Sequence, residues 1–357
     1  MTPTTDETKS DVQKYLDNLN TLRHVLTTRY PVGTTTPHEV VWTLNKTRLI
    51  HYLPTHPAKR TVRTPLLMVF ALMSRAYILD LRPGASFVEY MTNKGYDLYL
   101  LDWGAPGYED RELKFDDYVL DYMPRAIRKM KEVSGSEEFS MLGWCIGAIL
   151  STSYAALRPN DGLRNLILLT APLDFSKKDI GGFAKWVRAD YLDEEAVISA
   201  FGNMPPEMLD SGAKWLKPVD NYISNYVRLL ENLDNPKVVE SWHAMDTWVN
   251  DPIPMAGGVF RQLVNDFFRG NKLVDGTLTM RGEPVRLQNV KANLINFIAE
   301  ADHITPPCES ENTLPLFGSA DKEFVRVKGG HIGLMLSGTA NKITWPRIEA
   351  FLRERSE

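Results

Sequence analysis

The stretch Phe139-Ser-Met-Leu-Gly-Trp-Cys-Ile-Gly-Ala-Ile-Leu150 places a single cysteine between a predicted strand and a predicted helix. The apolar residues up to Leu142 predict a short buried strand, and those after Cys145 predict an apolar helix. Gly143 and Gly147 flank the cysteine, which is typical of a turn so sharp that a Cβ would collide with neighbouring backbone. We expect this turn to present the thiol at the strand end, where the N–H groups of the next helix favour negative charge.

Length and composition limit the number of domains, the class of binding partner and the cellular location that can be expected. The 357 residues suffice for one large α/β domain or two smaller ones, and the net charge of −4 gives no sign of a nucleic-acid-binding surface. The two cysteines, Cys145 and Cys308, are too few for a disulfide framework, and the polar N-terminal residues are unlike a signal peptide. No apolar run reaches the roughly 18 residues that suggest a membrane span. We therefore expect a cytoplasmic protein with no transmembrane segment and no nucleic-acid partner.

Strands alternate with helices on both sides of the cysteine turn. Two short β runs are expected within residues 40–53. Apolar runs then predict buried strands at residues 65–73, 97–102, 139–142, 163–172 and 292–299, and a further strand is expected at residues 323–327. Helices fill the intervals between most of these strands, a spacing that predicts a parallel sheet with right-handed crossovers. The fold class is therefore α/β with a mostly parallel central sheet.

Residues 173–290 interrupt the alternation, because they contain no clear buried strand and many aromatic residues. We interpret this insertion as a helical cap, or lid, that excludes water and shapes an acyl pocket. The α/β core then comprises residues 1–172 and 291–357. We interpret the aromatic residues individually as core residues of the cap and assign none of them a substrate contact. They are Phe183, Trp186, Phe201, Trp215, Trp242, Trp248, Phe260, Phe267 and Phe268.

Residues 11–26 carry apolar side chains at the spacing of one face of an amphipathic helix. The favoured interpretation is a helix packed over the domain, and the alternative is a docking helix for a partner subunit. The apolar positions are Val12, Leu16, Leu19, Leu22 and Leu26.

Three chemically reactive residue types occur in the order nucleophile, acid, histidine. Cys145, Asp302 and His331 each stand just beyond the end of a predicted parallel strand, where sites in open α/β sheets form. The same order and placement are typical of the catalytic triad of the α/β-hydrolase fold, with cysteine in place of the usual serine. We therefore predict this fold and this triad.

Each member of the triad has a purely structural alternative. Cys145 could be a small buried hydrophobic residue, Asp302 could cap the following helix, and His331 could be a loop histidine. His303 is a competing imidazole, but its adjacency to Asp302 makes contact between the two side chains awkward. Cys308 lacks such a turn and is interpreted as a packing residue. No cysteine or histidine spacing suggests a metal site, and we expect neither a metal nor a cofactor.

The residue types indicate acyl transfer. A histidine can take the proton of a thiol, and the thiolate is a strong nucleophile towards an activated acyl group. An aspartate behind the histidine would fix its tautomer. We expect the oxyanion hole to consist of the backbone N–H groups of Ile146 and Met73, with Leu72 and Ser74 as close alternatives to Met73. A thiol nucleophile suits a thioester substrate, because exchange between thioesters is nearly isoenergetic.

The chain resembles polyhydroxyalkanoate synthases, which are cysteine-dependent acyltransferases that polymerise (R)-3-hydroxyacyl-CoA. The resemblance is carried by five short motifs and one segment of the insertion, Val259 to Val274. The motifs are Gly143-Trp-Cys145-Ile-Gly147, Tyr77-Ile-Leu-Asp-Leu81, Asp102-Trp-Gly104, Asp302-His303-Ile304 and Gly329-Gly-His331-Ile332. Long single-subunit synthases carry an extra N-terminal domain that we do not find here, so the chain resembles the short catalytic subunit of a two-component synthase.

The resemblance implies that Cys145 carries the growing polyester, that His331 deprotonates it, and that Asp302 activates the substrate 3-hydroxyl group, orients His331, or does both. It implies (R)-3-hydroxybutyryl-CoA as the favoured substrate, with CoA as a released product rather than a cofactor. The expected partner is an E-type subunit (class III) or an R-type subunit (class IV), in a homodimer or hetero-oligomer at the surface of polyester granules. The residues that contact CoA are not identified. The rival functions are a thioesterase or polyester depolymerase of the same fold and a non-catalytic granule-associated protein.

Overall fold

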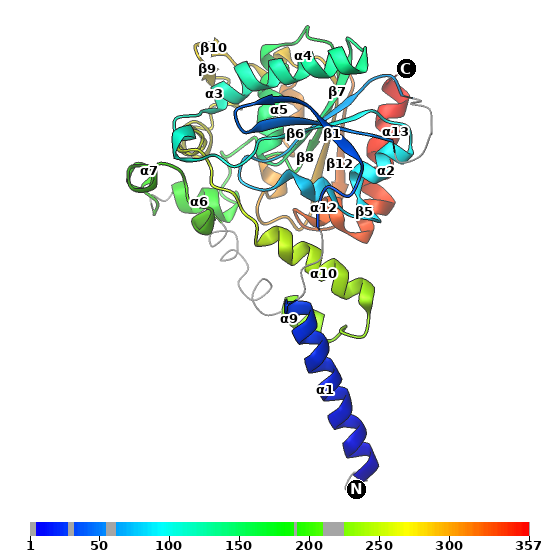
Figure 1. Cartoon of the computed structure of the whole chain (residues 1–357). Coiled ribbons are helices and arrows are strands. Elements are labelled where there is room, and N and C mark those ends of the chain that lie inside the picture. Colours follow the sequence, from blue (N-terminus) through cyan, green and yellow to red (C-terminus); the bar gives the residue numbers. More distant parts are fainter. Residues whose placement is uncertain (1–4, 28–31, 55–61, 189–190, 210–224, 357) are drawn as a thin grey trace.

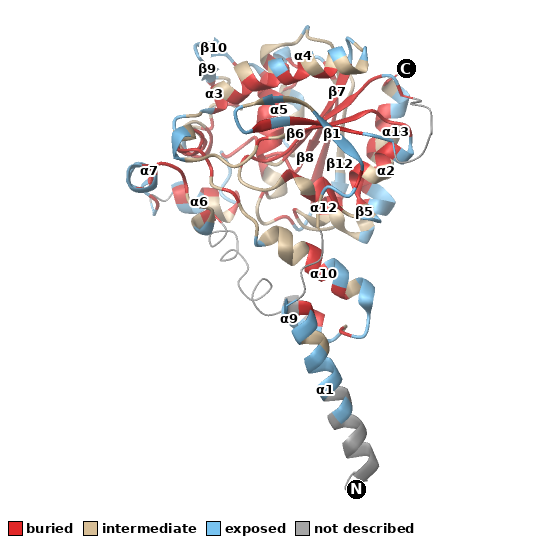
Figure 2. Cartoon of the chain, in the orientation of Figure 1, coloured by how far each residue is buried: buried red, intermediate tan, exposed pale blue. Residues whose placement is uncertain are grey.

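A mostly parallel sheet covered by helices on both faces forms the body of the molecule (Figure 1). The computed structural model describes residues 5–27, 32–54, 62–188, 191–209 and 225–356. Figure 2 shows that the central strands are almost entirely buried. This burial explains why their sequences are continuous apolar runs rather than alternating ones.

The main sheet has eight strands in the order β1-β2-β6-β3-β7-β8-β11-β12. The strands from β6 to β12 in this order pair in parallel, whereas β1 and β2 are antiparallel at one edge. All predicted strands are present, although β3 ends at Val69, so that Met73 lies in the turn beyond it. The strands are β1 (His38–Leu44), β2 (Thr47–Tyr52), β3 (Leu66–Val69), β6 (Leu98–Asp102), β7 (Phe139–Trp144), β8 (Leu163–Leu169), β11 (Asn293–Ala299) and β12 (Lys322–Val327). A separate small hairpin, β4 (Asp80–Arg82) and β5 (Ala85–Ser86), was not predicted.

Helices pack on the two faces of this sheet. On one face, α2 and α13 contact each other, and on the other face α5 packs against β7, β3 and β8. A helical run between β6 and β7 consists of α3 and α4 joined by a π-helical turn, η3. These helices are α2 (Phe87–Asn93), α3 (Phe115–Asp117), η3 (Tyr118–Tyr122), α4 (Met123–Ser134), α5 (Ile146–Leu157), α12 (Gly333–Leu336) and α13 (Trp345–Arg355).

Helices dominate the described part of residues 173–290. They are α6 (Gly182–Arg188), α7 (Glu194–Phe201), α9 (Asn225–Leu230), α10 (Pro236–Val249), α11 (Gly257–Gln262) and the π-helical η5 (Leu263–Arg269). The described part of the segment also contains a short hairpin that was not predicted, β9 (Thr279–Met280) and β10 (Glu283–Pro284), in which only Met280 is buried. Strands of two residues are too short to give a periodic signal. Trp215 lies outside the described residues.

The N-terminal helix α1 (Thr5–Thr27) projects away from the sheet (Figure 1), so the prediction that it packs over the domain is wrong. Among the described side chains of α1, two near its C-terminal end are anchored: Val25 is buried in a small cluster with Leu229 and Trp242, and Leu22 packs against this cluster. Leu16 and Leu19 are exposed. The side chains of Val12 and Leu26 lie outside the described part of the chain. An apolar stripe indicates which face of a helix can be buried, but it does not indicate which surface covers that face.

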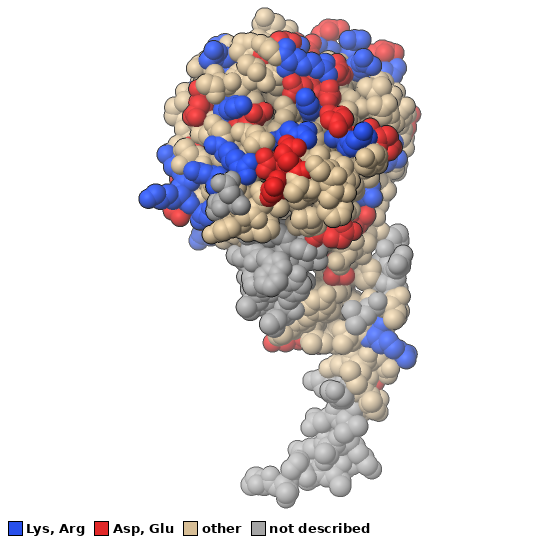
Figure 3. All heavy atoms as spheres, turned by 90° about the vertical axis from the view of Figure 1, so that its left-hand side faces the viewer, with Lys and Arg blue, Asp and Glu red and all other residues tan. Residues whose placement is uncertain are grey.

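Basic and acidic side chains are interspersed over the face of the body that carries α6 and α7 (Figure 3). Ion pairs also join distant elements of the chain, including Arg281 with Asp117 and Asp121, and Arg158 with Glu283. Within the described residues, no helix combines the length and apolar character that crossing a bilayer requires.

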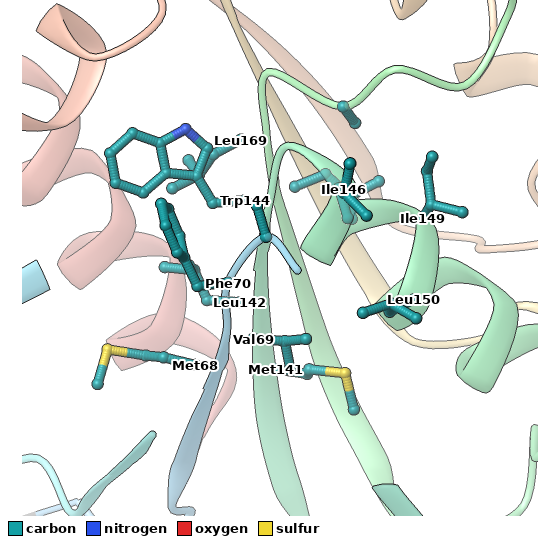
Figure 4. Packing of buried hydrophobic residues seen from close by; sticks show 14 of the residues in the cluster. Met68, Val69, Phe70, Met141, Leu142, Trp144, Ile146, Ile149, Leu150 and Leu169 are labelled. Carbon is teal, nitrogen blue, oxygen red and sulfur yellow. The ribbon is translucent and has the colours of Figure 1, made fainter. Parts of the chain in front are cut away.

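The turn between β7 and α5 packs closely against the end of β3. A Cβ added at Gly147 would lie 2.1 Å from the carbonyl oxygen of Val69, and one added at Gly143 would lie 2.7 Å from the Cα of Ala148. Figure 4 shows the apolar side chains of β3, β7 and α5 that surround this turn, among them Val69, Leu142 and Ile149. The first turn of α5 can therefore approach β3 only without a side chain at position 147.

Replacing Gly147 with Ala should lower the free energy of unfolding by about 3 kcal/mol, because the new methyl group meets backbone that cannot move aside. Gly338→Ala is the matched control, since a Cβ there meets nothing within 4 Å and should change stability little. Urea denaturation of both variants measures the difference. Equal stability of the two would contradict the close contact.

Candidate active site

Cys145 occupies a strained backbone position between β7 and α5. Its φ of 56° and ψ of −124° lie outside the regions that non-glycine residues ordinarily adopt. The backbone N–H of Cys145 donates to the carbonyl oxygen of Leu169 at 3.0 Å, which ties the turn to the end of β8. Helix α5 begins at the next residue, Ile146, so its first N–H groups surround the thiol. Strain of this kind, held by the surrounding packing, is frequent at active sites.

Asp302 and His331 meet beyond the ends of β11 and β12. The Nδ1 atom of His331 lies 2.7 Å from Oδ2 of Asp302. The other carboxylate oxygen, Oδ1, accepts hydrogen bonds from the backbone N–H groups of Ile304 and Thr305, each at 2.9 Å. The Asp302 side chain is fully buried. Its two oxygens thus hold the imidazole on one side and cap the following turn on the other.

The protonation of His331 is set by its charged neighbours. Burial lowers the pKa of this imidazole, but the charges of Asp302 and Cys145, together with hydrogen bonds to both side chains, raise it to about 10. Since Nδ1 faces Asp302, Nε2 is left for the thiol. The indole ring of Trp144 also lies against the imidazole, with ring centroids 6.4 Å apart. The arrangement favours the protonated form of His331.

The loop after β3, which contains Met73, is fastened at both ends by indole groups. The Nε1 of Trp103 donates to the carbonyl oxygen of Phe70 at 3.0 Å, and the Nε1 of Trp248 donates to that of Arg75 at 2.8 Å. The Arg75 guanidinium in turn pairs with Asp251 at 3.2 Å. These contacts hold the loop that carries Met73 against the site and connect it to α10.

An apolar cavity of about 90 Å³ opens beside Cys145. The lining residues include Cys145 itself and both residues predicted for the oxyanion hole, Met73 and Ile146. Most of the remaining wall is aliphatic or aromatic, with Thr305 and Glu309 as the polar exceptions among the described residues. The other lining residues are Pro172, Phe175, Phe183, Ala184, Leu209, Met255, Leu263, Phe268 and Ile304.

The structure therefore brings together Cys145, Asp302 and His331, and it places Met73 and Ile146 on the same cavity. Of the aromatic residues in the insertion, Phe183 and Phe268 line this cavity, while Phe267 packs against Phe115. Sequence reasoning assigned no substrate contact to the first two, because aromatic residues in a core and in a pocket give the same pattern. Glu309 was missed entirely, since Pro306-Pro-Cys-Glu-Ser310 resembles an ordinary polar loop.

Comparison with known proteins identifies the family. The family model described as the poly-beta-hydroxybutyrate polymerase (PhaC) N-terminus matches residues 5–91, and the alpha/beta hydrolase fold model matches residues 81–337. The poly(3-hydroxyalkanoate) polymerase subunit PhaC of Allochromatium vinosum is 34% identical, over 89% of this chain and 89% of that protein. The chain belongs to the PhaC polymerase family. The predicted family and the predicted acyltransferase class of enzyme are thereby confirmed.

Two further relatives have the same protein name, and this chain spans different shares of their lengths. The Synechocystis subunit is 30% identical over 98% of this chain and 92% of its own length. The Haloferax mediterranei subunit is 39% identical over 90% of this chain, which spans only 65% of that protein.

Solved structures support the fold alone. A monoglyceride lipase variant from Saccharomyces cerevisiae superposes with a TM-score of 0.57 at 16% identity, over 92% of this chain and 98% of the lipase. An esterase from Thermogutta terrifontis gives 0.53 at 13% identity, over 91% of this chain and 100% of the esterase. The predicted α/β-hydrolase fold of this PhaC family member is confirmed.

Replacing Asp302 with Asn should lower the pKa of His331, because the imidazolium loses a carboxylate partner while burial still opposes its charge. In the wild type the raised pKa adds stability that is complete below the unfolded value of about 6.5 and is lost as the pH rises through about 10. NMR of ¹³C-labelled histidine at pH 8 should therefore show an imidazolium in the wild type and a neutral ring in the variant.

The matched control is Asp97→Asn, which removes the buried carboxylate beside His51, 2.9 Å from its Nε2. This change should leave the His331 resonance where it is in the wild type. A neutral His331 in the wild type at pH 8 would contradict the assigned electrostatics.

Proposed function

We propose that the chain is the catalytic subunit of a two-component synthase that polymerises (R)-3-hydroxyacyl-CoA, with (R)-3-hydroxybutyryl-CoA as the favoured monomer. The observation that carries this proposal is the meeting of Cys145, His331 and Asp302 beside an apolar cavity that Cys145 lines. Relatives named poly(3-hydroxyalkanoate) polymerase subunit PhaC support the reaction class.

The residues divide the chemistry of acylation between them. The Cys145 thiolate attacks the thioester carbonyl carbon of the hydroxyacyl-CoA, and the backbone N–H groups of Ile146 and Met73 stabilise the developing oxyanion. As the bond between the acyl carbon and the CoA sulfur breaks, the leaving thiolate takes the proton held by His331. The products are an acyl thioester on Cys145 and free CoA.

Elongation forms one ester bond for each monomer. The 3-hydroxyl oxygen of an incoming (R)-3-hydroxyacyl-CoA attacks the thioester carbonyl carbon of the chain on Cys145. His331 takes the hydroxyl proton, because it gave its own proton to CoA during acylation and is neutral when this step begins. The ester bond forms as the bond between that carbon and the Cys145 sulfur breaks, which leaves the Cys145 thiolate beside the protonated His331 and the lengthened chain on CoA. The thiolate then attacks this CoA thioester as in acylation, and CoA leaves with the proton of His331.

Residues 173–290 act as the cap in this proposal. Phe183 and Phe268 come from this segment and form part of the apolar wall. A wall of this kind keeps water from the thioester and so favours transfer to a hydroxyl group over hydrolysis. The loop that carries Met73 contacts α10 through Trp248, so a change in the cap would reach the oxyanion hole.

We assign Asp302 the role of orienting and charging His331. Oδ2 binds the imidazole, Oδ1 binds two backbone N–H groups, and the side chain is fully buried. Because the side chain has no exposed surface, a substrate hydroxyl would have to displace neighbouring groups to reach this carboxylate. This arrangement favours the orienting role over the activating role, two alternatives that the family resemblance leaves open.

We infer a partner subunit of the E or R type and a location at the surface of polyester granules, in a homodimer or hetero-oligomer. The word subunit in the names of the relatives supports a multi-component enzyme. The projecting helix α1, with Leu16 and Leu19 exposed, offers a surface for such a partner.

Cys145→Ala should abolish CoA release and polymer formation from (R)-3-hydroxybutyryl-CoA, because no other group at the site can hold the acyl chain. The matched control is Cys308→Ala: the thiol of Cys308 donates to the carbonyl oxygen of Asp179 and does not line the cavity, so this variant should keep its activity. A thiol assay measures CoA, and polymer is weighed after solvent extraction, with and without a co-expressed E- or R-type subunit.

The same assay separates the rival functions. Free 3-hydroxybutyrate without polymer would contradict the synthase proposal and favour a thioesterase. Unchanged turnover of Cys145→Ala would exclude Cys145 as the nucleophile.

Asp302→Asn should slow acylation and elongation by similar factors, roughly 100- to 1,000-fold, because both steps depend on His331. Rapid-quench measurement of the first CoA released and steady-state polymer growth report the two steps separately. A loss confined to elongation would instead assign Asp302 to the substrate hydroxyl.

A further inference from the structure

Glu309 is a buried carboxyl group on the wall of the cavity that Cys145 also lines. It ends the short helical turn η7 (Pro307–Glu309) and is only 1% exposed. Acidic side chains are almost never buried to this extent unless they have partners, and the mechanism above makes no use of this one. Its position beside the acyl site therefore calls for a chemical reason.

One carboxyl oxygen of Glu309 has a clear structural partner. Oε1 accepts a hydrogen bond from the backbone N–H of Gly181 at 2.6 Å. The main-chain carbonyl of Glu309 accepts from the N–H groups of Leu173 and Asp174 at 3.1 and 2.8 Å. Glu309 thus anchors the beginning of the 173–290 segment, and this role uses one of its two side-chain oxygens.

Burial makes Glu309 a neutral group at ordinary pH. Burial and the negative charge of Asp302 outweigh the N–H of Gly181 and the charge of His331, and they raise the pKa of Glu309 to about 8. A carboxylic acid with this pKa is mostly protonated at pH 7. In that state it carries one O–H donor and keeps acceptor capacity, which suits an otherwise apolar wall.

The rest of the described wall contains few groups that can form a hydrogen bond with a hydroxyl group. Its aromatic and aliphatic side chains, such as Phe183, Phe268 and Met255, suit an alkyl chain. Thr305 also lines the cavity, and its hydroxyl is the other side-chain group of the described wall that could bind a substrate hydroxyl. A hydroxyl group buried in such a cavity without a partner would lose its hydrogen bonds to water without compensation.

We propose that the carboxyl group of Glu309 recognises the 3-hydroxyl group of the acyl chain that Cys145 carries. This inference rests on the proposed function and adds the residue that distinguishes a 3-hydroxyacyl thioester from a simple acyl thioester. The hydrogen bond uses the side-chain oxygen that does not bind Gly181. Glu309 acts here in substrate recognition and takes no part in bond breaking.

The test compares two thioesters that differ only in the hydroxyl group, (R)-3-hydroxybutyryl-CoA and butyryl-CoA. Both can acylate Cys145, and single-turnover release of CoA measures that step without elongation. Glu309→Leu should slow acylation by the hydroxyacyl thioester roughly 10- to 100-fold and change the rate with butyryl-CoA little. Glu309→Gln retains an acceptor for Gly181 and a donor for the substrate, so it should keep most of the preference.

Glu311→Leu is the matched control. Glu311 lies two positions further along the same segment, where it pairs with Arg326, and it does not line the cavity. Its variant should acylate with both thioesters as the wild type does. Circular dichroism and thermal melting of the Glu309 variants show how much of any loss reflects the anchoring of Gly181.

Two results would overturn the inference. If Glu309→Leu slows acylation by both thioesters equally, Glu309 is only an anchor of the insertion. If Glu309→Leu changes neither acylation rate, another group recognises the hydroxyl. Either result leaves the proposed function intact as long as the wild type makes polymer, whereas a wild type that releases no CoA from (R)-3-hydroxybutyryl-CoA refutes the proposed function itself.

Discussion

The approach of the first turn of α5 to the end of β3, with Gly147 against the carbonyl of Val69, is the constraint on which the site depends. It lets the chain reverse from β7 into α5 within one residue and forces Cys145 into its strained conformation. That conformation directs the thiol away from the sheet and leaves the first N–H groups of α5 beside it. The energetic cost of the strain is met by the packing of β3, β7 and α5 around the turn (Figure 4).

The parallel sheet converts this local turn into a site. Cys145, Asp302 and His331 follow β7, β11 and β12, whose C-terminal ends lie on one edge of the sheet. Asp302 links the imidazole to the turn after β11, because one carboxylate oxygen binds His331 and the other accepts from the N–H groups of Ile304 and Thr305. The same turn leads directly to Glu309, which fastens the start of the insertion. A single short segment after β11 thus connects the reactive histidine, the cavity wall and the 173–290 segment.

Much of the fold was predictable because strands that are buried on both faces have mostly apolar sequences. The main-sheet strands between β6 and β11 are covered on both faces, so Leu66–Val69 and Asn293–Ala299 are nearly continuous apolar runs. The meeting of Cys145, Asp302 and His331 followed from residue type, chain order and strand ends. The position of α1 could not be predicted from the sequence. The spacing of Leu16, Leu19 and Leu22 defines an apolar face of the helix but does not indicate which surface packs against it.

The sequence by itself determined the α/β-hydrolase fold, the cysteine turn and the three residues beyond the strand ends, because each depends on local spacing or on strand order. Only the tertiary structure decided which groups line the cavity. Phe183, Phe268 and Glu309 come from segments far apart from Cys145 in the chain, and their relation to it depends on how the insertion folds back. The charge states of His331 and Glu309 were likewise decided there, since a pKa depends on burial and on neighbours that chain order does not reveal.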